Sequence, residues 1–170
     1  MKHQLSNLLS DWEDRGVLYC VWKGVSKLHK VLGCEEDLDI LIDKKTLQAA
    51  RLILAENGFV EFKNVISRSD LGTLDFLKYL ENGEWVHIHL HVDILFGNSI
   101  QRDYRLPLAN KILASRVWNS DFDIWAISPI YDLSLFIIRH SLRSASVIPS
   151  ARYDLDLREI KDFYHRKHIA

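Results

Sequence analysis

The chain has 170 residues, of which 48% are apolar and 26% are charged, and its formal net charge is −1. This composition predicts a globular protein of one domain, or of one domain with a small helical appendage. The near-zero charge excludes the strongly basic footprint of most nucleic-acid-binding proteins, so nucleic acid is not an expected partner, although a local basic patch around a phosphate site stays open.

Targeting signals and cysteine usage favour a cytoplasmic protein. Residues 1–16 are polar and charged, without the apolar run of a signal peptide. The longest apolar run elsewhere is far below the ~20 residues that a membrane span needs. The two cysteines, Cys20 and Cys34, lie beside apolar residues, which indicates reduced structural thiols. We therefore expect a soluble, cytoplasmic protein without a membrane partner.

The N-terminal half alternates predicted helices with short strands. The apolar periodicity predicts, in chain order, a helix over 5–15, a strand over 17–22, a helix over 25–32, a strand over 37–43, a helix over 46–57, a strand over 59–62 and a polar loop over 64–72. Asn57-Gly58 is a typical end for the clearest of these helices, because glycine accepts the left-handed conformation there.

The second half begins with a predicted hairpin and is then mainly helical. Apolar runs over 74–80 and 85–96 flank Asn82-Gly83, which is a strong hairpin signal. The remaining expected elements are a helix over 108–117, a strand over 122–126, a helix from Ser128-Pro129 to 142 and a charged helix over 153–167.

This order predicts an α+β fold whose N-terminal part is of the α/β type. We expect a mixed central sheet with flanking helices, followed by a helical C-terminal part. The corresponding domain prediction is a core over 1–105 and a helical subdomain over 106–170 that packs on it.

The most informative segment is 37–43, Asp-Leu-Asp-Ile-Leu-Ile-Asp. Alternate side chains of a strand point to opposite faces, so Asp37 and Asp39 share one face and the apolar residues between them point into a core. Two carboxylates about 7 Å apart along a strand repel each other unless a cation lies near them. Mg²⁺ is usually held by one or two carboxylates plus substrate phosphates, so this segment is a candidate metal–phosphate site.

A further carboxylate lies in the apolar run 85–96. Strict alternation places four polar side chains of this run on one face: His87, His89, His91 and Asp93. A buried, unpaired carboxylate costs several kcal/mol, so Asp93 lies at an exposed strand end or meets a cation. If this strand pairs beside 37–43, Asp93 completes a three-carboxylate cluster with Asp37 and Asp39.

The three histidines leave three interpretations open. They are ordinary polar residues of a half-solvated sheet face, or they contact a phosphate or substrate, or they bind a transition metal together with Asp93. The spacing of about 6.7 Å between alternate residues is loose for three ligands of one ion.

A glycine turn precedes the acidic strand. Residues 21–27 bring together a strand end, Gly24 and a helix start, and the free N–H groups of a helix N-terminus suit phosphate. The simpler interpretation is an ordinary turn glycine. Gly24 precedes Asp37 by 13 residues, which is enough for one helix and a return to an adjacent strand.

Three motifs in this order, Lys23-Gly24-Val25-Ser26, Asp37-Leu38-Asp39 and Asp93, resemble the signature of the nucleotidyltransferase fold superfamily, which includes the DNA polymerase β-like enzymes. The helix end at Asn57-Gly58-Phe59 and the histidine-rich strand make the chain most similar to the uncharacterised bacterial nucleotidyltransferase-like family. The resemblance covers about 17–96 and implies a nucleotidyltransferase-like core. One departure is that Val25 follows Gly24, so that Ser26 comes one place late.

The resemblance implies transfer of a nucleoside monophosphate from a nucleoside triphosphate to a small-molecule, sugar or protein acceptor, with release of pyrophosphate. Two Mg²⁺ ions, or Mn²⁺, would be the cofactors. Asp37 and Asp39 would hold the ion on the triphosphate, Asp39 and Asp93 would hold the ion at the acceptor, and Asp93 would help to deprotonate the acceptor. Four residues would contact the phosphates: Lys23, Gly24, Ser26 and Lys27. Lys23 has the alternative of a structural surface lysine.

Several other residues carry smaller expectations. Three are candidate contacts for the acceptor or for phosphate: His89, His91 and Arg139. Arg139 lies within one helical turn of His140 and Arg143. The simpler interpretation of these three residues is a helix face exposed to solvent. Asp43 is expected to cap the helix that follows, with Thr46 as the competing cap. Four tryptophans are expected in the core rather than as base-stacking platforms: Trp22, Trp85, Trp118 and Trp125.

Three functional hypotheses follow. The first is an active Mg²⁺-dependent nucleotidyltransferase. The second is a non-catalytic nucleotide-binding module of the same fold, or the N-terminal domain of a larger bifunctional enzyme, and the departure at Val25 motivates it. The third is a metallohydrolase built on the His87, His89, His91 and Asp93 face.

Overall fold

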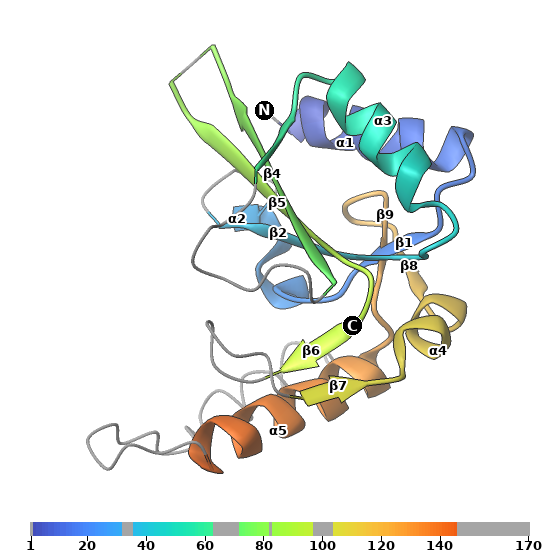
Figure 1. The fold of residues 1–170 in the computed structure, drawn as a ribbon, viewed down its shortest axis with the longest axis vertical. Coiled ribbons are helices and arrows are strands. Elements are labelled where there is room, and N and C mark those ends of the chain that lie inside the picture. The colour runs from blue at the N-terminus through green and yellow to red at the C-terminus, as the bar shows by residue number, and fades with distance from the viewer. Residues whose placement is uncertain (1, 32–35, 63–71, 82, 97–103, 146–170) are drawn as a thin grey trace.

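A computed structural model describes residues 2–31, 36–62, 72–81, 83–96 and 104–145 (Figure 1). Cys34, most of the predicted loop over 64–72 and the predicted helix over 153–167 lie outside these ranges. The helices are α1 (Lys2–Asp14), the short 3-10 helix η1 (Val25–Lys27), α2 (Leu28–Val31), α3 (Leu47–Glu56), α4 (Ala109–Ala114) and α5 (Pro129–Ala145). None of the helices in the described ranges is long and apolar enough to cross a membrane.

The described strands form two sheets. They are β1 (Tyr19–Val21), β2 (Leu38–Ile42), β3 (Val60–Phe62), β4 (Thr73–Tyr79), β5 (Trp85–His91), β6 (Ile94–Phe96), β7 (Tyr104–Leu106), β8 (Val117–Asn119) and β9 (Ile124–Ala126). Seven of them form one sheet in the order β3-β4-β5-β2-β1-β9-β8, and β6 pairs with β7. β2 is antiparallel to β1 and parallel to β5. The predicted α+β class with a mixed central sheet and flanking helices is confirmed.

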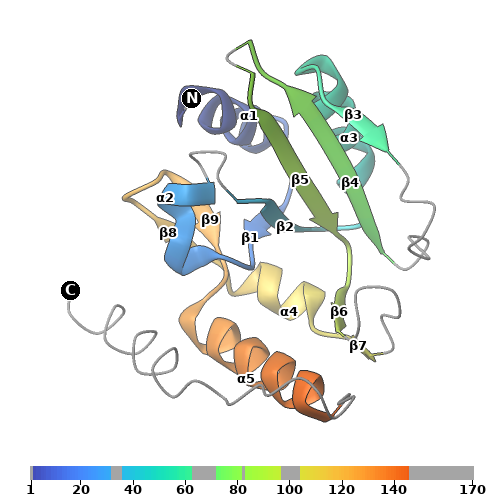
Figure 2. The ribbon, with the colours of Figure 1, turned by 90° about the vertical axis from the view of Figure 1, so that its left-hand side faces the viewer.

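Each face of the large sheet has its own hydrophobic core. α1 and α3 pack on one face, in a core that includes Ile53 of α3 and Ile40 of β2, and α4 and α5 pack on the other, in a core that includes Ile112 of α4 and Leu41 of β2. Figure 2 shows the two pairs of helices above and below the strands. The period-2 alternation of β2 supplies both cores, because its successive side chains point to opposite faces.

Residues 115–119 differ from the sequence interpretation. The predicted helix over 108–117 ends at Ala114, and β8 follows it, while β9 lies within the predicted strand over 122–126. β9 runs parallel to β1, so the main sheet extends beyond residue 105 into the part predicted to be helical. The cross-strand contact of Trp118 with Trp125, whose ring centroids are 5.2 Å apart, supports the β8–β9 pair.

The predicted strand over 85–96 is two strands in different sheets. β5 ends at His91, and β6 begins at Ile94. Between them the Val92 N–H donates to the carbonyl of Gly72 over 2.9 Å. Ile94 packs in the core under α4 and α5, whereas Ile88 of β5 packs in the core under α1 and α3. The alternation of β5 therefore does not continue through Asp93.

Two of the four tryptophan expectations and the capping expectation are wrong. Trp22 is buried and Trp125 packs against the core, but Trp85 and Trp118 are exposed. Trp85 is the first residue of β5, and Trp118 lies in β8, a strand at the edge of the sheet. The N-cap of α3 is Thr46 rather than Asp43, whose side chain instead accepts from the backbone N–H of Lys45 over 2.8 Å.

Candidate metal and phosphate site

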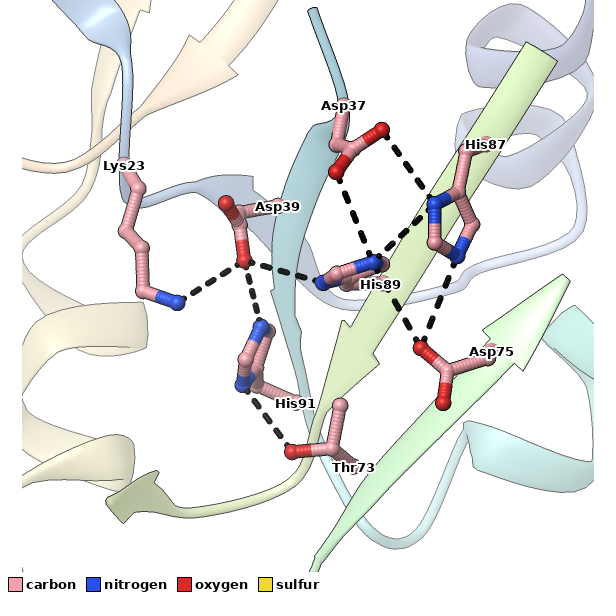
Figure 3. Close-up of polar contacts among 8 residues, drawn as sticks. All are labelled: Lys23, Asp37, Asp39, Thr73, Asp75, His87, His89 and His91. Carbon is pink, nitrogen blue, oxygen red and sulfur yellow. Dashed lines mark hydrogen bonds and ion pairs between the residues drawn. The ribbon is translucent and has the colours of Figure 1, made fainter. Parts of the chain in front are cut away.

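The pairing of three strands gathers polar side chains on one face of the large sheet. Asp39 of β2 lies opposite His89 of β5, and Asp75 of β4 lies opposite His89 from the other side. Facing residues on neighbouring strands share a face of the sheet. The result is a group of six side chains that we call the Asp/His cluster: Asp37, Asp39, Asp75, His87, His89 and His91 (Figure 3).

Asp39 is held by two donors at one end of the cluster. The Lys23 Nζ lies 2.9 Å from Asp39 Oδ1, and the His91 Nε2 lies 2.6 Å from the same oxygen. An ionised carboxylate only accepts hydrogen bonds, so the proton of this contact is on His91 Nε2. The hydroxyl of Thr73 lies 3.3 Å from His91 Nδ1. His91 is therefore fixed between Thr73 and Asp39.

These contacts and the burial of the site determine the charges of His91 and Asp39. Burial lowers the pKa of His91 to about 3, so its imidazole is neutral at neutral pH and its Nδ1 accepts from the Thr73 hydroxyl. Burial alone would raise the pKa of Asp39, but the hydrogen bond from His91 and the Lys23 ammonium outweigh it and hold the pKa well below its usual range. Asp39 is thus a permanent anion that suits cation binding and is a poor base.

The other end of the cluster brings two imidazoles between two carboxylates. The His87 Nδ1 lies 3.2 Å from Asp37 Oδ1 and 3.2 Å from the His89 Nε2. The His89 Nε2 is 3.8 Å from Asp37 Oδ2 and 3.5 Å from Asp75 Oδ1. Burial lowers the pKa of His89, and the carboxylates of Asp39, Asp75 and Asp37 only partly oppose it.

Asp93 does not join this cluster, which corrects the sequence interpretation. β5 does pair beside β2 as expected, but the register sets His89 opposite Asp39 and His91 opposite Leu41. Asp93 lies beyond the end of β5, where it pairs with Lys44 over 3.1 Å and with Arg105 over 2.7 Å. The acidic strand and the histidine strand meet, but the third carboxylate of the cluster is Asp75.

The glycine turn lies next to the cluster through Lys23. Gly24 has a φ of 69°, the left-handed region that favours glycine, and it is the N-cap of η1. Lys23 lies 4.4 Å from the centroid of the Trp22 ring as it reaches Asp39. Lys27 of η1 pairs with Glu36, 3.2 Å away, just before the acidic strand. Ser26 is exposed in the same short helix.

The candidate residues of α5 lie on the same side of the sheet as the cluster. Arg139 and His140 lie in this helix, which packs on the sheet face that carries the Asp/His cluster. The ring of His140 contacts that of Phe136, with centroids 4.2 Å apart. A contact of Arg139 with an acceptor or a phosphate stays a prediction.

Asp75 and Thr73 are the residues that sequence reasoning missed. A signal for Asp75 was present, because it is an acid in an apolar strand, as Asp93 is. The hairpin also fixes its position: Tyr79 pairs with Trp85, and counting back along the two strands sets Asp75 opposite His89. Thr73 had no comparable signal, because a threonine is ordinary in a strand.

Two groups of three side chains place potential metal ligands within 4.8 Å of one another in the described residues: Asp37 with His87 and His89, and Asp39 with His89 and His91. Both groups combine carboxylate oxygen with imidazole nitrogen, a donor set that suits Zn²⁺, Mn²⁺ and similar ions. No protein-family model, curated protein or solved structure matches the chain.

Proposed function

We propose that the protein is a divalent-metal-dependent nucleotidyltransferase with Asp37 and Asp39 as metal-binding carboxylates. The observation that carries this proposal is the contact of Lys23 with Asp39, 2.9 Å apart in space and 16 residues apart in the chain. It joins the glycine turn to the acidic strand, the two parts of the sequence that most resemble a nucleotidyltransferase signature.

The residues present fit a Mg²⁺ ion on a triphosphate. Mg²⁺ needs one or two protein carboxylates when substrate phosphates supply further oxygens, and Asp39 in β2 and Asp37 directly before it can offer these. Asp39 stays ionised because its pKa is held low. The ion would supply positive charge at the phosphates, where negative charge develops as pyrophosphate leaves.

The roles of the chain's own residues follow from their positions. Lys23 would bind a phosphate oxygen, and Lys27 in η1 would bind another, with Gly24 allowing the chain to approach closely. His91 is a positioning residue, because it holds the carboxylate of Asp39 through its Nε2–H and is itself almost fully buried. The role of a base at the acceptor, which the sequence resemblance gives to Asp93, has no support from the position of Asp93.

A non-catalytic nucleotide-binding module is the second candidate. The position of Asp93 favours it, because the signature assigns a third carboxylate to a residue that pairs with Lys44 and Arg105 instead. Such a module would bind a metal–nucleotide complex through the glycine turn and the acidic strand without transferring it.

The test combines binding and turnover on the full chain. Calorimetry with each of the four Mg²⁺–nucleoside triphosphates measures binding, and pyrophosphate release with labelled nucleotide and a panel of sugars, small molecules and proteins measures transfer. Transfer that Asp39→Asn abolishes and Asp93→Asn retains supports the first candidate. Binding without turnover supports the second, and absence of binding to every nucleotide contradicts both.

A further inference from the structure

We propose that Asp37, His87 and His89 bind a transition-metal ion of the Zn²⁺ class, with a carboxylate behind each of the two imidazoles. The three ligand atoms are a carboxylate oxygen of Asp37, the Nδ1 of His87 and the Nε2 of His89. The His87 Nδ1 lies 3.2 Å from Asp37 Oδ1 and 3.2 Å from the His89 Nε2, and the His89 Nε2 lies 3.8 Å from Asp37 Oδ2. One ligand atom from each of the three residues lies within 4.8 Å of the other two. Ligands at ~2.1 Å from a tetrahedral ion are about 3.4 Å apart, so these separations are close to the spacing that one ion requires.

Hydrogen bonding within this group leaves one contact unsatisfied. The His87 Nδ1 faces the Asp37 carboxylate and the His89 Nε2 at the same distance of 3.2 Å. A ring nitrogen of a neutral imidazole either donates or accepts. If the His87 Nδ1 donates its proton to Asp37, it has no lone pair left to accept from His89. If the His87 Nδ1 instead accepts from His89, its lone pair also faces the negative carboxylate of Asp37. A cation between the three groups uses a lone pair of each.

The surroundings of the two imidazoles match the outer shell of a metal site. Metal-bound histidines commonly present their other ring nitrogen to a carboxylate, which fixes the tautomer and the ring orientation. The His87 Nε2 lies 3.6 Å from Asp75 Oδ1, and the His89 Nδ1 lies 3.7 Å from Asp39 Oδ1. Each ligand histidine of the proposed site therefore has a carboxylate near its far nitrogen, from a neighbouring strand in each case. Both distances are longer than a hydrogen bond, and the His87 Nε2 is buried without a hydrogen-bond partner among the described residues.

The donor set also selects the class of ion. Two imidazoles and one carboxylate suit Zn²⁺, Co²⁺ or Mn²⁺ better than Mg²⁺, which prefers oxygen ligands. Three protein ligands leave a fourth position of a tetrahedral ion for water or another small ligand, as in catalytic rather than structural zinc sites. Asp37 is the most exposed of the three, with 55% of its side chain accessible, so this position opens to solvent.

This inference does not rest on the proposed function. The ion is bound in the absence of nucleotide, and the Lys23–Asp39 contact takes no part in it. Asp37 belongs to both sites. The variants His87→Gln and Asp75→Asn test the transition-metal site and leave Lys23, Asp37 and Asp39 intact.

The experiment is a Co²⁺ titration of the full chain after chelator treatment, without nucleotide. We expect one ion per chain, the intense visible absorption of four-coordinate Co²⁺, displacement by Zn²⁺ and no displacement by excess Mg²⁺. Asp75→Asn should weaken binding roughly 10- to 100-fold, and His87→Gln should weaken it further. The matched control is His29→Gln, which removes an exposed imidazole of α2.

Three results would overturn the proposal: no saturable Co²⁺ binding by the folded wild type, the weak spectrum of octahedral Co²⁺, or equal effects of His87→Gln and His29→Gln. Circular dichroism checks that each variant is folded. If His87→Gln does not fold, the wild-type spectrum and the Asp75→Asn affinity decide the question.

Discussion

Asp39 and Asp93 are carboxylates of nearly equal exposure, 17% and 15% of the side chain, in different electrostatic surroundings. Asp93 meets two cations, Lys44 and Arg105. Asp39 belongs to the Asp/His cluster, where Lys23 pairs with it and two further carboxylates, Asp37 and Asp75, lie around the same histidines (Figure 3). Asp93 has two cationic partners of its own, whereas Lys23 is the cationic partner of one of the three carboxylates in the Asp/His cluster.

The difference teaches that an acid in an apolar strand is not by itself a sign of a cation site. Both carboxylates follow that pattern in the sequence, and both avoid the cost of an unpaired buried charge. Asp93 does so through exposed cationic side chains of α3's preceding loop and of β7. In the Asp/His cluster, the negative charge of the carboxylates is compensated only in part, which leaves the cluster suited to a bound ion.

The largest expected effect separates the two carboxylates by activity. Asp39→Asn removes a metal ligand worth several kcal/mol of transition-state stabilisation, so nucleotidyl transfer should fall by at least about 100-fold. Asp93→Asn should change the rate by less than about threefold, because its partners lie outside the cluster. Pyrophosphate release measures both rates, and a larger loss in Asp93→Asn than in Asp39→Asn would reverse the comparison.

The second effect concerns the support of Asp39. His91→Gln replaces a buried imidazole that donates to Asp39, so we expect a loss of about 2 kcal/mol in the free energy of unfolding. Urea denaturation of the variant and of His29→Gln, an exposed control, measures this loss. Equal stabilities of the two variants would show that the His91–Asp39 contact contributes nothing.

The third effect is the pH dependence of stability. The pKa of His91 is about 3 in the folded chain and about 6.5 when unfolded, so the unfolded state takes up the proton first as the pH falls. This contribution is complete above about pH 6.5 and is lost below it, by up to about 1.4 kcal/mol per pH unit. Asp39, whose folded pKa is also lowered, adds a loss below about pH 4. Between pH 6.5 and 4.5, His91→Gln should show a shallower slope than wild type, and parallel slopes would argue against a buried neutral His91.

The smallest effect is the stability cost of removing Asp93. Its cationic partners are more than half exposed, and exposed ion pairs contribute little, so Asp93→Asn should lose about 1 kcal/mol. Urea denaturation at low and high salt measures this, with the difference from wild type shrinking at high salt. A loss well above that of His91→Gln would mean that the Asp93 group holds the fold more than the cluster does.

Local patterns predicted much of the fold and one half of the site. The alternation of 37–42 and 85–91 identified two strands, their buried faces and the shared face of Asp37, Asp39 and the histidines. The Gly24 turn was expected where a φ of 69° requires glycine. These features depend on neighbours within a few residues, which the sequence displays directly.

Register and chain reversal were not predictable in the same way. Whether Asp39 lies opposite His89 or Asp93 depends on the register between two strands that are 50 residues apart in the chain. A register shift of two residues keeps every apolar side chain on its face, so the hydrophobic pattern does not select one register. The end of β5 at His91 depends on contacts of Val92 and Asp93 with Gly72, Lys44 and Arg105, which come from other segments. Asp75 was within reach, because the hairpin fixes its partner.

The most direct test of a cation site at the Asp/His cluster is an anomalous-difference map from crystals of the full chain grown with Mn²⁺. We predict a peak within bonding distance of Asp37 or Asp39 and of at least one cluster imidazole, and none at Asp93. A map with no peak at the cluster, or with its main peak between Asp93 and its neighbours, would contradict the account.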